Sequence, residues 1–271
     1  MPFTNAAGES VHYVEHGPGP GAAAYTAVLL HGFSLDHRVM TGCFEPVFAD
    51  RPGWRRVYLD LPGMGRSVAP SSLRSTDDVF AVVRAAVAQL VPRGRYALCG
   101  ESYGGYLARG LVAVDPAPVA GLALVCPVVV PEHASRELPA PVVLIRDPAA
   151  GEQHEVAVVQ TAETLRHTDA EVLAGFDVAD AAAVARIQER YAGTFPLEPA
   201  RQPYGGPALV LLGRQDSVTG YRDAWGILEH YPRATFAVLD RAGHLAQIEQ
   251  PALFSALVSE WLDRVEEQSA A

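Results

Sequence analysis

The amino-acid sequence predicts an α/β protein with a mostly parallel central sheet and helices on both of its faces. Short, unbroken apolar runs recur along the chain, which is typical of strands buried on both faces. Segments with apolar residues at helical spacing alternate with these runs through short links, and this alternation favours a parallel sheet. The 271 residues are 49% hydrophobic and 19% charged, which suits one large domain with a sizeable core.

The first part of the chain carries this alternation. A helix with one apolar face is expected over residues 76–90, and a second helix carries Leu107, Leu111 and Val114 at helical spacing. Unbroken apolar runs predict strands at residues 11–14, 27–30, 57–59, 96–99 and 119–125. His12 and His16 share one face of the first strand, but two histidines without a third ligand do not make a metal site, and an exposed edge strand is the simpler interpretation.

The alternation of predicted strands and helices stops between residues 131 and 204. Apart from a strand at 141–145, this segment reads as helices at 156–166, 170–176 and 178–191. We therefore divide the chain into a core part (1–130), a helical lid or cap insertion (131–204) and a second core part (205–271). The insertion holds 12 Asp and Glu against 6 Arg, so it would disfavour strongly anionic substrates if those charges faced the site. A helical addition without a gating role is the alternative to a lid.

The core pattern resumes after the insertion. Apolar runs predict strands at residues 208–212 and 235–239, with a helix at about 221–229 between them. A final helix begins near Pro251, a residue that suits a first helical turn.

One short motif lies between a predicted strand and a predicted helix. Gly100, Ser102 and Gly104 form Gly-x-Ser-x-Gly. A serine in so tight a turn has a strained backbone and needs small residues two positions to either side. The turn exposes the hydroxyl at the carboxyl end of the sheet, beside the N–H groups that begin a helix. Ser102 is therefore the candidate nucleophile.

Two further residues complete a candidate catalytic triad. Asp216 and His244, like Ser102, fall just past the end of a predicted strand. The carboxyl ends of parallel strands share one edge of the sheet, so these residues are expected to converge there. We predict that His244 takes the Ser102 proton and that Asp216 orients the imidazole. Asp240 and Asp147 are the competing acids, and the position of Asp216 after the penultimate strand favours it.

Other residues are expected around this triad. The backbone N–H groups of Phe33 and Tyr103 are the candidate donors to an oxyanion. His31 is expected to brace its loop more than to act as a base, and Glu101 is either an extra acid or a neighbour of the pocket. The residues that we expect to line the substrate pocket are His31, Ser34, Glu101 and Leu245.

These motifs resemble the α/β-hydrolase superfamily over essentially the whole chain outside the insertion. The matching segments are His31-Gly32-Phe33, Asp60 to Ser67, Gly100 to Gly105, Gly213 to Asp216, and Gly243-His244. The resemblance implies a serine hydrolase that uses the order serine, acid, histidine and needs no cofactor and no metal. Related haloalkane dehalogenases and epoxide hydrolases use an aspartate nucleophile, which Ser102 argues against.

Within this superfamily, the sequence favours hydrolysis of a carboxylic ester, or a lactone or thioester, of a small and largely uncharged molecule. Carbon–carbon bond or amide cleavage is an alternative with the same chemistry. Meta-cleavage hydrolases usually carry Asn and Met around the serine and Trp after the histidine, where this chain has Glu101, Tyr103 and Leu245. Proline iminopeptidase-like enzymes carry His-Gly-Gly-Pro where this chain has Phe33 and Ser34. A ligand-binding protein that keeps the fold but turns over little is the third alternative.

Composition excludes several other functions. The net charge of −10 disfavours nucleic acid as a partner. All 21 basic side chains are arginine, which excludes a Schiff-base lysine, a Walker-A lysine and a Ser-Lys dyad. The three cysteines, Cys43, Cys99 and Cys126, form no paired motif, and no signal peptide or membrane-length apolar run is recognised. These observations predict a cytoplasmic protein with no membrane partner.

Overall fold

The computed structural model describes residues 2–92, 94–150, 157–199 and 202–270. Its centre is an eight-stranded sheet with the strand order β1-β2-β4-β3-β5-β6-β9-β10. Strands β1 and β2 are joined to the sheet in antiparallel pairs, and the other six strands are parallel. The strand bounds are Phe3–Ala6 (β1), Glu9–His16 (β2), Tyr25–Leu30 (β3), Trp54–Leu59 (β4), Tyr96–Glu101 (β5), Val119–Val125 (β6), Ala208–Gly213 (β9) and Ala234–Leu239 (β10). The expected strands of the core and their parallel arrangement are confirmed.

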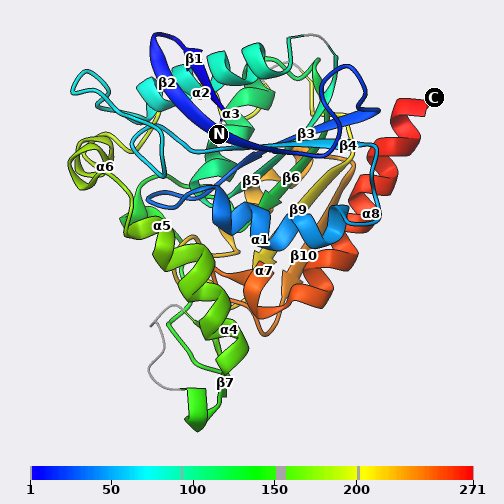
Figure 1. Ribbon diagram of the computed structural model, residues 1–271. Coiled ribbons are helices and arrows are strands. Elements are labelled where there is room, and N and C mark those ends of the chain that lie inside the picture. The colour runs from blue at the N-terminus through cyan, green and yellow to red at the C-terminus, as the bar shows by residue number, and fades with distance from the viewer. Residues whose placement is uncertain (1, 93, 151–156, 200–201, 271) are drawn as a thin grey trace.

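Helices cover both faces of this sheet (Figure 1). One layer contains α2 (Thr76–Leu90) and α3 (Tyr103–Val114), and the opposite layer contains α1 (His37–Phe48) and α8 (Pro251–Ala270). The parallel strands alternate their side chains between two buried clusters, since Val28 and Leu30 belong to one and Ala27 and Leu29 to the other. This two-sided burial explains why the strands read as unbroken apolar runs.

Two elements near the N-terminus differ from the sequence prediction. Helix α1 was not expected, although its buried residues recur at helical spacing; it contains Pro46, a residue that usually ends or breaks a helix. Strand β2 is not an exposed edge, because β1 pairs with its outer side. His12 is therefore fully buried.

The segment 131–204 has short elements of mixed type. It contains a two-stranded parallel sheet, β7 (Ile145–Arg146) with β8 (Val159–Gln160), and a helical run that extends away from the core (Figure 1). The run comprises α4 (Ala162–His167), a π-helical stretch (Thr168–Leu173) and α5 (Ala174–Phe176), and α6 (Ala181–Gln188) follows after a short loop.

Three predictions for this segment were wrong in extent. The helix expected at 156–166 begins only at Ala162, because Thr161 caps it in a reciprocal capping box with Thr164. Residue 156 lies outside the described residues. The strand expected at 141–145 pairs only at Ile145 and Arg146, and the helix expected at 178–191 begins after its N-cap Asp180. In the core, the helix expected at 221–229 is a 3₁₀ helix over Asp223–His230.

Among the residues that the structure describes, no helix is both long enough and apolar enough to span a bilayer.

Candidate active site

Ser102 lies in a strained turn between β5 and α3. Its φ is +52° and its ψ is −114°, in a region that side chains rarely adopt. A Cβ on Gly104 would lie 2.2 Å from the Leu30 carbonyl oxygen, and a Cβ on Gly100 would lie 2.4 Å from the Gly104 carbonyl oxygen. Only glycine fits at either place, which is the physical requirement of the Gly-x-Ser-x-Gly motif.

A continuous hydrogen-bonded chain connects Ser102, His244 and Asp216. The distance from His244 Nε2 to Ser102 Oγ is 2.9 Å, and the distance from His244 Nδ1 to Asp216 Oδ2 is also 2.9 Å. Asp216 Oδ2 also accepts a hydrogen bond from the Thr219 hydroxyl at 2.6 Å, and Oδ1 accepts from the Val218 and Thr219 backbone N–H groups. Because Nδ1–H donates to the carboxylate, Nε2 is left to accept the serine proton.

The competing acids lie elsewhere. Asp240 and Asp147 are both exposed, and Asp147 accepts the backbone N–H of Ala149. Asp216 is fully buried against His244. The structure therefore brings together the three residues that the sequence had placed at one edge of the sheet.

The charges of Asp216, His244 and Glu101 shift the pKa values of the triad residues. Burial alone would raise the pKa of Asp216, but the charge of His244 and hydrogen bonds from His244 and Thr219 hold that pKa below its ordinary value. Burial alone would lower the pKa of His244, but the charge and hydrogen bond of Asp216 and the charge of Glu101 raise it to about 9. The site therefore stabilises an imidazolium.

The two candidate oxyanion donors, the backbone N–H groups of Phe33 and Tyr103, lie on segments beside Ser102. Tyr103 is the first residue of α3, and the first N–H groups of a helix have no partner inside it. Phe33 follows β3 and lines the same cavity as Ser102. Its ring packs edge-on against Tyr103 and Tyr191, with ring centroids 5.1 and 5.3 Å apart.

Ser102 and His244 open onto a cavity of about 900 Å³. About half of its lining comes from the segment 131–204, including Arg136, Phe176 and Tyr191. Acidic and basic residues both occur in the lining, which includes Asp77, Glu101, Glu132 and Glu189 as well as Arg136 and Arg190. The cavity is therefore not lined by acids alone, although the insertion as a whole is acidic.

Of the expected pocket residues, Glu101 and Leu245 line the cavity, but the described lining does not include His31 or Ser34. His31 is fully buried behind the loop, where its Nδ1 bonds the Gly32 carbonyl and its Nε2 accepts the Leu61 N–H at 2.9 Å. It therefore braces the loop. Ser34 occupies a left-handed turn position with a φ of +64°.

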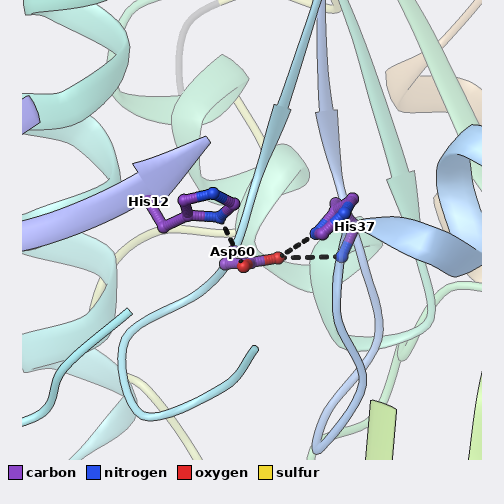
Figure 2. A group of neighbouring side chains, drawn as sticks. All are labelled: His12, His37 and Asp60. Carbon is purple, nitrogen blue, oxygen red and sulfur yellow. Dashed lines mark hydrogen bonds and ion pairs between the residues drawn. The ribbon is translucent and has the colours of Figure 1, made fainter. Parts of the chain in front are cut away.

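His12, His37 and Asp60 form a separate cluster, which Figure 2 shows. His12 Nδ1 lies 2.7 Å from Asp60 Oδ2, and His37 Nδ1 lies 2.8 Å from Asp60 Oδ1. Each oxygen also accepts a backbone N–H, from Arg66 and His37 respectively. Burial alone would raise the pKa of Asp60, but the His37 hydrogen bond and the nearby histidine charges hold that pKa far below its usual range.

Three side chains in one cluster could in principle hold a metal ion. Here the Asp60 oxygens already accept four N–H groups, so a metal would have to displace them. The cluster ties β2, the loop after β4 and the start of α1 together (Figure 2). We interpret it as a structural clamp, and His16 takes no part in it because its ring lies near Glu45.

Two residues near the site had no signal in the sequence. Thr219 fixes the Asp216 carboxylate, and it follows the Gly-x-x-Asp segment in an ordinary loop. Glu249 accepts the Gly243 N–H beside His244 and the Val158 and Val159 N–H groups of the insertion. Only the fold shows that this one carboxylate joins the histidine loop to the insertion.

The fold and this arrangement define a class of protein, and comparison with known families identifies it. A model described as the alpha/beta hydrolase family matches residues 27–257. The chain therefore belongs to the alpha/beta hydrolase family, as its motifs predicted.

The sequence identity between this chain and individual relatives is low. The chain is 29% identical over 276 residues to a 2-hydroxy-6-oxononadienedioate/2-hydroxy-6-oxononatrienedioate hydrolase from Burkholderia vietnamiensis, an alignment that covers 92% of this chain and 85% of that protein. A 116-residue alignment with a pimeloyl-(acyl-carrier protein) methyl ester esterase from Nitrosomonas europaea is 34% identical and covers 43% of this chain and 40% of the relative. An alpha/beta superfamily hydrolase from Oenococcus oeni PSU-1 superposes with a TM-score of 0.88 at 25% identity, over 98% of this chain and 100% of that one.

Proposed function

We propose that this protein is a serine hydrolase that cleaves a carboxylic ester, or a lactone or thioester, of a small and largely uncharged molecule. The observation that carries the proposal is the hydrogen-bonded chain from Ser102 through His244 to the buried Asp216, at the edge of a cavity. This arrangement suits nucleophilic attack on a carbonyl carbon.

The proposed reaction has two halves. Ser102 Oγ attacks the carbonyl carbon while its proton passes to His244 Nε2, and the N–H groups of Phe33 and Tyr103 stabilise the oxyanion. His244 then gives the proton to the leaving group, and an acyl-enzyme remains on Ser102. A water molecule, deprotonated by His244, attacks the acyl carbon, and the bond from that carbon to Ser102 Oγ breaks as His244 returns the proton to Oγ and the acid is released. Asp216 holds the imidazole in the tautomer that both halves require.

We propose that the segment 131–204 acts as a lid over the site. Its residues supply about half of the cavity lining, and Val172 and Phe176 add apolar surface to it. Such a cover limits water and shapes the acyl site. The Nitrosomonas europaea relative, whose name is that of a methyl ester esterase, supports ester cleavage.

Carbon–carbon hydrolysis is the second candidate. It is favoured by the Burkholderia vietnamiensis relative, which covers nearly the whole chain. It is disfavoured by the residues around the nucleophile and the histidine, which are Glu101, Tyr103 and Leu245.

The test uses p-nitrophenyl esters of increasing acyl length, with the wild type beside Ser102→Ala. We expect turnover in the wild type and a loss of about 10⁶-fold in kcat for the variant. A fluorophosphonate probe with intact-mass analysis should show one adduct in the wild type alone. Turnover by the Ser102→Ala variant at the wild-type rate would disprove the assignment. An adduct without ester turnover would direct the substrate search to carbon–carbon substrates such as the 2-hydroxy-6-oxo dioates in the name of the Burkholderia vietnamiensis relative. Neither adduct nor turnover would favour a ligand-binding protein.

A further inference from the structure

One carboxylate in the site is buried without a side-chain hydrogen-bonding partner, and the Gly32 backbone N–H is the group that favours its ionised form from the loop beside it. Glu101 is the last residue of β5, directly before Ser102, and is only 1% exposed. Neither of its carboxylate oxygens has a hydrogen bond of normal geometry to any described residue. A Cβ on Gly32 would lie 2.4 Å from Oε2, so the carboxylate packs directly against the loop that holds Phe33. Burying a carboxylate is costly unless a charge compensates it.

The compensating group is His244. Glu101 Oε1 lies 3.6 Å from His244 Nε2, the same nitrogen that contacts Ser102 Oγ at 2.9 Å. Asp216 binds the opposite ring nitrogen. The imidazole is therefore placed between two carboxylates, one at each nitrogen, and Arg136 is the cation whose charge opposes them.

We propose that Glu101 is a second acidic partner of His244, which stabilises the imidazolium formed when His244 takes the Ser102 proton. This inference rests on the proposed serine-hydrolase function. In that step the Ser102 O–H proton moves to Nε2, Oγ bonds to the carbonyl carbon, and the C=O electron pair moves onto the oxyanion. The positive charge appears beside Glu101 Oε1, in a region of low water content where electrostatic attraction is strong.

The same contact affects the resting enzyme. Burial raises the pKa of Glu101 to about 7, with the His244 charge acting against this shift and Asp216 adding to it. Above that pH the ionised Glu101 favours protonated His244, which cannot accept the serine proton. Glu101 therefore moves the onset of activity to higher pH while it stabilises the charged transition state. Its removal should reverse both effects.

Glu101→Gln tests the proposal, because it removes the charge and keeps the shape. The titration of the His244 imidazole is followed by NMR in the wild type, in Glu101→Gln and in Glu132→Gln. Glu132 is a matched control, because its carboxylate lines the same cavity but is exposed. We expect the His244 pKa to fall by about one unit or more in Glu101→Gln, as for loss of an opposite charge within about 4 Å. Glu132→Gln should leave it unchanged.

The kinetic profile gives a second measurement. The acidic limb of kcat/KM against pH should move to lower pH by the same amount, and kcat at its plateau should fall several-fold. Glu101→Asp keeps the charge on a shorter side chain. The His244 pKa in this variant should therefore lie between the values in the wild type and in Glu101→Gln. Glu101→Asp also provides the test if Glu101→Gln does not fold.

An unchanged His244 pKa in Glu101→Gln would overturn the proposal. So would an equal shift in Glu132→Gln, since that result would indicate a general change of charge. The NMR titration does not depend on turnover. If the wild type hydrolyses no ester, the proposed function fails while the His244 titration still decides whether Glu101 is its partner.

Discussion

The sheet core and the insertion 131–204 are held together in different ways. Strands such as β6 and β9 are buried along their whole length between two helical layers. In the insertion the strands have two residues each, and Val142, Val143 and Leu144 are exposed. The insertion is attached at several places: Ala183 and Ile187 are buried in one core cluster and Val172 in the other, and Glu249 accepts the Val158 and Val159 N–H groups. The core positions Ser102, Asp216 and His244, and the insertion supplies about half of the cavity lining.

After Ser102→Ala, the substitution expected to lower kcat most is at Asp216, on the core side of the site. Asp216→Asn should lower kcat by about 10⁴-fold, because an amide no longer selects the imidazole tautomer that leaves Nε2 free. Asp240→Asn is the control, because Asp240 is exposed on a neighbouring loop. Ester hydrolysis rates of the two variants provide the measurement. Similar rates in both would show that Asp216 is not the acid of the triad.

A substitution inside the sheet should mainly affect stability. Leu124 is fully buried on β6. Leu124→Ala should lower the free energy of unfolding by about 3 kcal/mol, through lost transfer energy and the cavity left behind. Urea unfolding followed by circular dichroism measures this change. A loss under about 1 kcal/mol would mean that this strand is not packed as tightly as the structure indicates.

The clamp at Asp60 should give a smaller, pH-dependent effect. Asp60→Asn should lower the free energy of unfolding by about 2 kcal/mol at neutral pH, because an amide cannot accept N–H groups from both His12 and His37 on both oxygens. The folded-state pKa of Asp60 lies below its unfolded value. Its stabilisation is therefore complete above about pH 4 and is lost as the pH falls further.

Urea unfolding of both proteins at pH 7 and pH 3 measures this dependence. The difference between wild type and Asp60→Asn should shrink at the lower pH. A difference that grew on acidification would contradict the assigned ionisation of Asp60.

The smallest expected effect comes from the insertion. Phe176 lines the cavity but is 51% exposed. Phe176→Ala should change the free energy of unfolding by no more than about 0.5 kcal/mol, while changing the preference between short and long acyl esters by about 10-fold. The ratio of kcat/KM values for two acyl lengths measures the preference. An unchanged ratio with a large loss of stability would indicate that this segment acts as core and not as a lid.

The sequence predictions were more accurate for the sheet core than for the insertion. Strands such as β6 and β9 were predicted because burial on both faces leaves no polar side chain in them, and the Gly-x-Ser-x-Gly turn was predicted because its sterics admit only glycine two positions to either side of the serine. Helix α1 was missed although its apolar residues recur at helical spacing, and it contains Pro46, which usually indicates the end of a helix. The strand at Val159 was read as helix, because isolated apolar residues do not distinguish the two and the Glu249 contacts that hold it extended come from a distant part of the chain.

The sequence by itself determined the α/β architecture, the family, and the places of Ser102, Asp216 and His244 at the ends of strands. Their order and spacing suffice for this, because the carboxyl ends of parallel strands meet at one edge. Only the tertiary structure decided that Asp60 is clamped between two histidines and that Glu101 lies 3.6 Å from His244 Nε2. Such contacts form between side chains that are far apart in the sequence and are brought together in the folded interior. A local pattern of residues therefore cannot predict them.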